Sequence, residues 1–228
     1  MDLADGTVDY VLVRRRGRRG VGLKVDETGL TVSAPLTMPM SQVEAAVRES
    51  ERWVLKKIGE WRHKRVPAVS WAEGARLPFL GGGLTLRLFH GRSGAVREGT
   101  ELWVRTPDGT EAHIARAVIA WYKREAKDYL AARLVALSER AGLVPPKFML
   151  SPAMGRWGSC NTRREIRLTW RLMKAPPELV DYVICHELAH LREMNHSAAF
   201  WAEVERQCPG YRALRDRLHA IDHLYRSF

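Results

Sequence analysis

The amino-acid sequence predicts an α+β protein, β-rich up to about residue 108 and then built of helices packed against a small sheet. In the first portion, short runs of alternating apolar and polar residues are separated by glycine and proline, which is typical of strands. In the second portion, apolar residues recur at helical spacing over residues 111–140. The chain has 228 residues, enough for two domains, which we expect at residues 1–108 and 109–228.

The first portion is predicted to contain short antiparallel strands and one helix. The helix is expected at about residues 41–64, where Ser41 and Glu44 form a capping box before apolar residues at helical spacing. Turn residues such as Gly81-Gly82-Gly83 separate the strands. The strands are expected at residues 10–13, 21–25, 30–32, 77–80, 84–89 and 102–104.

The second portion is predicted to begin with a long helix that Gly142 ends, since glycine readily adopts the conformation that terminates a helix. Pro176 and Pro177 open a later helix, because proline is tolerated in a first turn. The complete expected order is a helix at 111–140, a strand near 148–150, a basic loop at 155–160, a strand at 164–170, the Pro176 helix, and helices at 198–207 and 211–223.

Composition excludes several classes of protein. Apolar residues make up 46% and charged residues 28% of the chain, as in ordinary globular proteins, and the absence of a long apolar run argues against a membrane partner. The first 20 residues are acidic and then basic, the reverse of a secretory signal. The 3 cysteines do not form a disulfide framework. We therefore expect a cytoplasmic protein.

A formal net charge of +11 indicates a possible polyanionic partner, nucleic acid or nucleotide. Basic residues are concentrated at residues 14–19, 48–65 and 156–174. Charge alone does not identify a binding groove, so a merely solvated basic surface is the competing interpretation.

The most informative segment is residues 186–196, which reads HELAHLREMNH. Residues four apart on an α-helix differ by about 40° in direction, so His186 and His190 share a face and can converge on one ion. Glu187 is rotated from His186 by about 100°, which suits a general base better than an equivalent ligand. This pattern predicts a Zn²⁺ site that activates water for hydrolysis.

A catalytic zinc site usually has three protein ligands and one open position. His196 is the expected third ligand, but a straight helix would turn it away from His190. The chain must therefore leave the helix near Asn195, a residue that tolerates a left-handed conformation, and Ser197 can then cap the next helix. Asn195 is also a candidate for orienting a metal ligand.

From Arg156 onward the chain resembles the YgjP-like metallopeptidase family, a group of SprT-related, minimal gluzincin-type zinc proteins. The resemblance rests on the segments RWGSC at 156–160, IRLTW at 166–170, DYVIC at 181–185, HELAHLREMNH at 186–196, and on Phe200-Trp201. The front portion is also similar to that family, so the resemblance covers most of the chain. Metzincins share the histidine spacing, but here Glu193 replaces their glycine.

The resemblance implies a zincin-like metallopeptidase domain with one Zn²⁺, held by His186, His190 and His196, with Glu187 as the base, acting on a protein or peptide. Two other interpretations remain open. The same ion and base could serve a nucleotide phosphohydrolase (a nucleoside triphosphate pyrophosphatase), with arginines neutralising phosphates. Alternatively, the chain is a non-catalytic nucleic-acid-binding module with structural zinc, although Glu187 would then have no purpose.

Five residues are candidates for binding substrate. Arg156, Trp157 and Ser159 lie in a loop that could face the metal, where Arg156 could stabilise an oxyanion. The strand at 164–170 is expected to form the edge of the cleft, with main-chain groups near Arg167 and Thr169 holding an extended peptide by β-augmentation.

Overall fold

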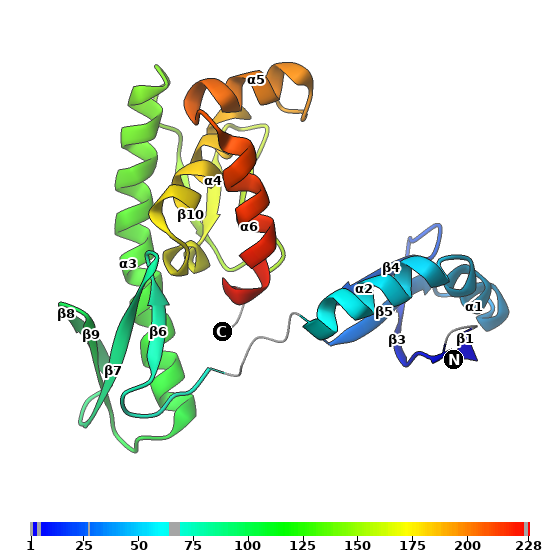
Figure 1. Ribbon diagram of the computed structural model, residues 1–228, viewed down its shortest axis with the longest axis horizontal. Helices are drawn as coiled ribbons and strands as arrows, with labels where there is room; N and C mark the ends of the chain where they lie inside the picture. Colours follow the sequence, from blue (N-terminus) through cyan, green and yellow to red (C-terminus); the bar gives the residue numbers. More distant parts are fainter. Residues whose placement is uncertain (1, 4–5, 27, 64–68, 226–227) are drawn as a thin grey trace. The chain divides into compact units, whose positions relative to one another are not determined.

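Two hydrophobic cores organise the chain, and each belongs to a separate unit of a mixed α+β structure (Figure 1). The computed structural model describes residues 2–3, 6–26, 28–63, 69–225 and 228. The first unit spans residues 1–67 and the second residues 68–228. The predicted α+β class is confirmed.

The first unit contains two small sheets. Strands β1 (Asp2–Leu3) and β2 (Gly6–Thr7) pair with each other. The larger sheet has the order β3-β5-β4, formed by β3 (Tyr10–Arg15), β4 (Gly22–Asp26) and β5 (Gly29–Pro35). Strands β4 and β5 are antiparallel, but β3 runs parallel to β5, so the expectation of purely antiparallel strands is wrong. Alternation of apolar residues fixes the face that each strand buries but not its partner.

Two helices cover this sheet where one was expected. They are α1 (Met40–Glu49) and α2 (Glu51–His63), and Ser50 ends the first. The predicted capping box is wrong, because the residue before α1 is Pro39, without a side-chain cap, and Ser41 already lies within the helix. Val43, Val47 and Val54 are buried in the core as their spacing predicted. Residues 64–65, the end of the predicted helix and of the second basic cluster, lie outside the described residues.

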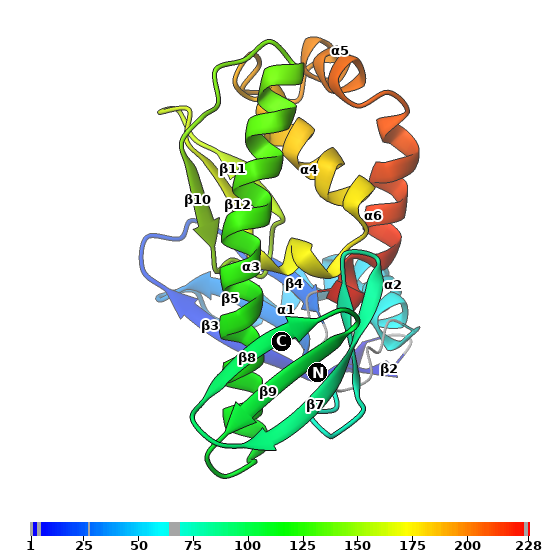
Figure 2. The same cartoon turned by 90° about the vertical axis from the view of Figure 1, so that its left-hand side faces the viewer.

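The second unit begins with a four-stranded sheet of order β6-β7-β9-β8. Its strands are β6 (Arg76–Phe79), β7 (Gly82–His90), β8 (Gly94–Glu98) and β9 (Glu101–Thr106), of which β8 was not expected. The sheet packs against the long helix α3 (Glu111–Arg140) and shares its core (Figure 2). The units therefore divide near residue 67 rather than at the expected residue 108, because this sheet buries its apolar face on α3.

A three-stranded sheet of order β10-β12-β11 and three further helices complete the second unit. The strands are β10 (Phe148–Ser151), β11 (Gly158–Cys160) and β12 (Ile166–Thr169), followed by a 3-10 turn, Trp170–Lys174. Strand β10 is parallel and β11 antiparallel to β12. The helices are α4 (Pro177–Ala189), α5 (Ala198–Gln207) and α6 (Tyr211–Tyr225).

Helix α4 lies at the centre of the second unit, in contact with α3, α5, α6 and β11 (Figure 2). It begins at Pro177, as predicted. Leu179, Ile184 and Leu188 are fully buried. Arg133 of α3 donates two hydrogen bonds, of 2.5 and 2.6 Å, to the carboxylate of Asp181. This bidentate pair adds a directional contact to the apolar packing and fixes α4 against α3.

The longest helix, α3, has 30 residues and carries charged side chains along its length. Within the described ranges, no helix is both long enough and apolar enough to cross a membrane.

Substitution of Leu134 tests the packing of the core that supports α4. Its side chain is 1% exposed, whereas the adjacent Val135 on the same helix is 41% exposed. We expect Leu134→Ala to lower the free energy of unfolding by about 2–5 kcal/mol, because it removes buried methyl groups and leaves a cavity. Val135→Ala should stay within about 0.5 kcal/mol of the wild type. Urea denaturation of both variants measures this, and equal effects would contradict the assigned core.

Candidate metal centre

The structure brings the three predicted histidines to one point. His186 lies in the last turn of α4, His190 caps the end of that helix, and His196 comes just before α5. One ring nitrogen from each side chain lies within 4.8 Å of the others. His186 and His190 stand one helical turn apart on one face, which is the arrangement their spacing predicted.

A short turn after α4 brings His196 back beside His186 and His190. The side-chain oxygen of Asn195 accepts a hydrogen bond of 3.1 Å from the backbone N–H of Ser197. Ser197 then caps α5 as predicted, by accepting a 3.3 Å hydrogen bond from the N–H of Phe200. Asn195 does not have a positive φ, so the expected left-handed conformation is wrong. Its side chain shapes the chain reversal through the Ser197 hydrogen bond.

The nitrogen positions fit a metal ion. Nε2 of His186 lies 3.2 Å from Nε2 of His196. Two zinc–nitrogen bonds of about 2.0–2.1 Å at a tetrahedral angle separate the nitrogens by about 3.4 Å, close to this distance. Nδ1 of His190 lies 3.1 Å from the carbonyl oxygen of Glu193. With the proton on Nδ1, this nitrogen donates a hydrogen bond to the carbonyl oxygen, and Nε2 keeps a free electron pair for a metal. The three imidazoles thus match the donor set of a zinc site.

Burial keeps the two helical imidazoles neutral, which is the form that binds a metal. Burial, with the neighbouring His190, His196 and Arg215, lowers the pKa of His186 to about 3. Burial also lowers the pKa of His190, although its hydrogen bond to Glu193 acts in the opposite direction. Near neutral pH both rings therefore carry a free electron pair without first losing a proton.

Glu187 is a buried carboxyl group, 5% exposed, beside this cluster. Burial raises its pKa to about 8, against the opposing influence of Arg156. In the described part of the chain its Oε2 atom has no hydrogen-bond partner. A Cβ atom added at Gly158 would lie 2.5 Å from Oε1 of Glu187, so only glycine allows β11 to approach this closely. The carboxyl group is held between its own helix and the main chain of β11.

Phe200 holds the histidine cluster from the side of α5. Its ring centroid lies 4.9 Å from that of His186, 4.5 Å from that of His190 and 4.7 Å from that of His196. The side chain is fully buried. These contacts restrict the orientation of all three rings and so help to hold the cluster together.

A cavity of about 590 Å³, here called the metal-side cavity, opens beside the cluster. It brings together His186, Glu187 and His196 with aromatic, apolar and basic side chains from α4, α5, α6 and β11. Its full lining is Trp157, Gly158, Tyr182, Val183, His186, Glu187, His196, Trp201, Arg215, Leu218 and His219.

Of the residues predicted to face the metal, Trp157 lines the cavity and Arg156 lies close enough to influence the pKa of Glu187. Ser159 lies in β11, opposite Arg167, and is not among the lining residues. Sequence reasoning missed the positions of Gly158, which stands inside the quoted RWGSC segment, and of Trp201, which was named only for the family resemblance. It also missed Tyr182, Arg215 and His219, because only tertiary structure brings α6 to the metal helix.

The expectation that strand 164–170 forms the cleft edge is wrong. That strand, β12, is the central strand of its sheet and pairs with β10 on one side and β11 on the other. The main-chain groups of Arg167 and Thr169 are therefore committed to the sheet. The Thr169 side chain is buried and caps the following 3-10 turn. The edge strand that contacts α4 is β11.

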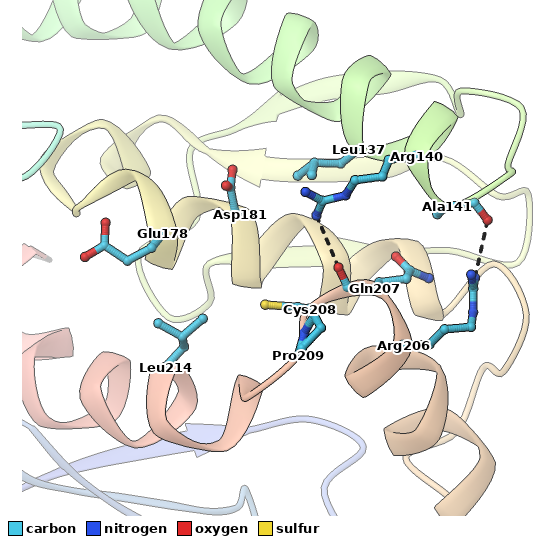
Figure 3. A pocket seen from close by; sticks show the side chains of 10 residues that line it. All are labelled: Leu137, Arg140, Ala141, Glu178, Asp181, Arg206, Gln207, Cys208, Pro209 and Leu214. Carbon is cyan, nitrogen blue, oxygen red and sulfur yellow. Dashed lines mark hydrogen bonds between the residues drawn. The ribbon is translucent and has the colours of Figure 1, made fainter.

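A second cavity, of about 410 Å³, borders the same helix at Glu178 and Asp181 but contains none of the three histidines (Figure 3). Its charged side chains have protein partners. Asp181 pairs with Arg133 and Glu178 with Arg217, while Arg140 and Arg206 donate to the carbonyl oxygens of Gln207 and Ala141. These interactions account for its charged groups structurally, although Oε1 of the lining residue Gln207 has no hydrogen-bond partner in the described chain. The metal-side cavity, which His186, Glu187 and His196 line, is the candidate site.

Comparison with known proteins identifies the family of the chain. Residues 19–221 match the family model described as YgjP-like, metallopeptidase domain. Among solved structures, the zymogen of the metallopeptidase abylysin from Pyrococcus abyssi shares 27% identity, covering 40% of this chain and 92% of that chain, with a TM-score of 0.37. The zymogen of jannalysin from Methanocaldococcus jannaschii shares 22% identity, covering 43% and 96%, with a TM-score of 0.33. No curated protein matches the chain.

The buried carboxyl group predicts a pH dependence of stability in the metal-free protein. Between the ordinary glutamate pKa of 4.5 and about 8, Glu187 is protonated in the folded chain and ionised in the unfolded chain. The folded chain then binds more protons, so this group's contribution to stability is lost as the pH rises to about 8. We expect Glu187→Gln to become steadily more stable than the wild type across this range, by at most about 1.4 kcal/mol per pH unit.

Urea denaturation in the presence of a chelator, at about pH 5 and about pH 8, measures this difference. Both proteins contain the same histidines, so the pH dependence that the histidines contribute cancels in the difference between the two free energies of unfolding. A constant difference between the two free energies would show that Glu187 titrates normally.

Proposed function

The chain belongs to the YgjP-like metallopeptidase family, and from this membership we propose that it is a zinc-dependent peptidase with Glu187 as general base. The observation that carries the proposal is the convergence of His186, His190 and His196 beside a buried Glu187, with one cavity lined by two of these histidines and by Glu187. We assign the three imidazoles as the ligands of one Zn²⁺. Three neutral nitrogen donors and a free position are the usual set for a catalytic zinc.

When bound, zinc supplies Lewis acidity, which makes water a stronger acid and polarises the scissile carbonyl group. Glu187 takes the proton from the attacking water, and its burial between α4 and β11 directs the carboxylate toward the cavity. After the C–N bond breaks, the same carboxyl group returns the proton to the leaving amine. Arg156 is a candidate for stabilising negative charge near Glu187, on the basis of its electrostatic influence there.

The edge of β11 offers a place for an extended peptide. Thr169 donates to the carbonyl oxygen of Trp157, and Asn161 donates to that of Glu165, so alternate residues of this segment bond to the β12 side. The main-chain groups of Gly158 and Cys160 therefore point to the open edge. We propose that substrate adds to β11 by β-augmentation, which replaces the role first expected of Arg167 and Thr169.

A nucleotide phosphohydrolase is the second candidate, since the same base could serve attack on a phosphoryl group. Three arginines, Arg156, Arg164 and Arg167, were expected to neutralise phosphates. None of them lines the metal-side cavity, although Arg156 lies near Glu187, and this disfavours the phosphohydrolase. A nucleic-acid-binding module with structural zinc would leave the buried Glu187 without a purpose. Contact with nucleic acid through the basic surface, and a cytoplasmic location, stay predictions. Casein cleavage and nucleoside triphosphate hydrolysis, assayed side by side, separate the two enzymatic candidates.

Glu187→Gln tests the proposed base. We expect the rate of peptide cleavage to fall by about 10²–10⁴-fold, because an amide cannot accept the proton, while the zinc content is unchanged. His196→Ala should instead lose zinc, and Glu139→Gln, an exposed change at the end of α3, should leave both properties intact. Activity measured on fluorogenic peptides and zinc measured by elemental analysis decide the outcome. Full activity in zinc-loaded Glu187→Gln would exclude this residue as the base.

Gly158→Ala tests the contact between β11 and the base. The added Cβ would lie 2.5 Å from Oε1 of Glu187, so the carboxyl group must move. We expect kcat to fall by about 10-fold or more, because small displacements of a reacting group are costly. Gly155→Ala is the matched control, since its Cβ would meet no atom within 4 Å. Equal kcat values for the two variants, with zinc bound in both, would contradict the role assigned to this contact.

A further inference from the structure

Arg215 places a positive charge on the wall of the metal-side cavity. It lies on α6, and its guanidinium carbon is 4.7 Å from the centroid of the Trp201 ring. Its positive charge is close enough to contribute to the low pKa of His186 and to oppose the rise in the pKa of Tyr182 that burial causes, and both of these residues line the same cavity. Arg215 is therefore part of the surface that a bound substrate would meet.

The Arg215 guanidinium has no acidic partner among the described residues. Two neighbouring arginines differ: Arg217, two positions along α6, pairs with Glu178 at 2.7 Å, and Arg206 pairs with Glu203 at 2.6 Å. In the described chain the Arg215 guanidinium instead lies over the face of Trp201. Stacking on an aromatic ring orients a guanidinium group while leaving its N–H edges available.

The chemistry of this wall fits a carboxylate. A guanidinium edge presents two parallel N–H donors that match the two oxygens of a carboxylate. The surrounding wall is largely aromatic and apolar, with Trp157, Tyr182, Val183 and Leu218. Arg215 is itself exposed, so a substrate can reach it. A bound peptide that covers the guanidinium would exclude water and so strengthen a charge-assisted hydrogen bond. A lysine side chain of a substrate would be repelled there by the like charge of Arg215.

We propose that Arg215 selects peptides that carry a carboxylate close to the scissile bond. The carboxylate comes either from an Asp or Glu side chain or from a free C-terminus, and Arg215 binds it without taking part in the bond-breaking step. This inference rests on the proposed peptidase function and names the substrate class of that site.

Paired peptides test the selectivity. In an otherwise neutral fluorogenic peptide, one Glu or one Lys is placed in turn at each position flanking the cleaved bond. We expect a position at which wild-type kcat/KM favours Glu over Lys by about 10- to 100-fold, mostly through KM, as for hydrogen bonds between charged groups. Arg215→Ala should remove the preference and Arg215→Glu should reverse it. Arg212→Ala, an exposed arginine of α6 outside the cavity, should keep it.

Two further experiments are needed. One identifies the source of the carboxylate, and the other distinguishes failure of this inference from failure of the proposed function. A peptide ending at the preferred position, with a free or an amidated C-terminus, distinguishes a terminal carboxylate from a side chain. Calorimetric binding of the Glu and Lys peptides to metal-free Glu187→Gln, with and without Arg215→Ala, needs no turnover. If wild-type protein cleaves no peptide, the proposed function fails, while the binding arm still decides the role of Arg215.

The inference is overturned if the wild type treats Glu and Lys alike, or if Arg215→Ala leaves the preference in place. It is also overturned if Arg215→Ala lowers kcat equally for every peptide, because the residue would then act on the reaction rather than on selection.

Discussion

The position of α4 is the constraint on which the site depends. The helix must be buried to fix two imidazoles and a carboxyl group, yet one face must remain open to a cavity. Buried leucine and isoleucine side chains and the Arg133–Asp181 pair fix the helix within the second unit. The turn that brings His196 back beside His186 and His190 then completes the cluster. Rigid placement matters because a zinc site and a general base tolerate little displacement.

Burial favours the uncharged forms of Glu187 and His186, and metal binding would reverse this effect at Glu187. Without a metal, the folded chain keeps Glu187 protonated and His186 neutral near pH 7, since both pKa values are shifted toward the uncharged form. A divalent cation beside the carboxyl group would favour its ionised form again. Loading the site would thus convert Glu187 from an acid into a base, which couples metal binding to the protonation state that hydrolysis requires.

The sequence predicted what depends on helical geometry and missed what depends on strand pairing. The spacing of His186 and His190, the cap at Ser197 and the end of α3 near Gly142 are local properties, and the structure agrees with each. The identity of the edge strand is not local, because β11 lies in a segment that was predicted to be a loop, and only its pairing with β12 makes it a strand with one free edge. The capping box at Ser41 failed because Pro39 begins the helix earlier.

The two cavities beside α4 differ in a way that bears on function. In the one bordered by Asp181, arginines and carboxylates satisfy each other or main-chain carbonyls, so the polar groups stabilise the fold. In the metal-side cavity, Glu187 has an oxygen without a partner in the described chain, and Arg215 stacks on Trp201 without an acid. A buried polar group that the fold leaves unsatisfied, such as this oxygen of Glu187, is costly unless a ligand completes it. The difference in how the charged groups are paired supports the proposed site on the histidine side of α4, where a peptide carrying a carboxylate would meet the exposed Arg215 cation.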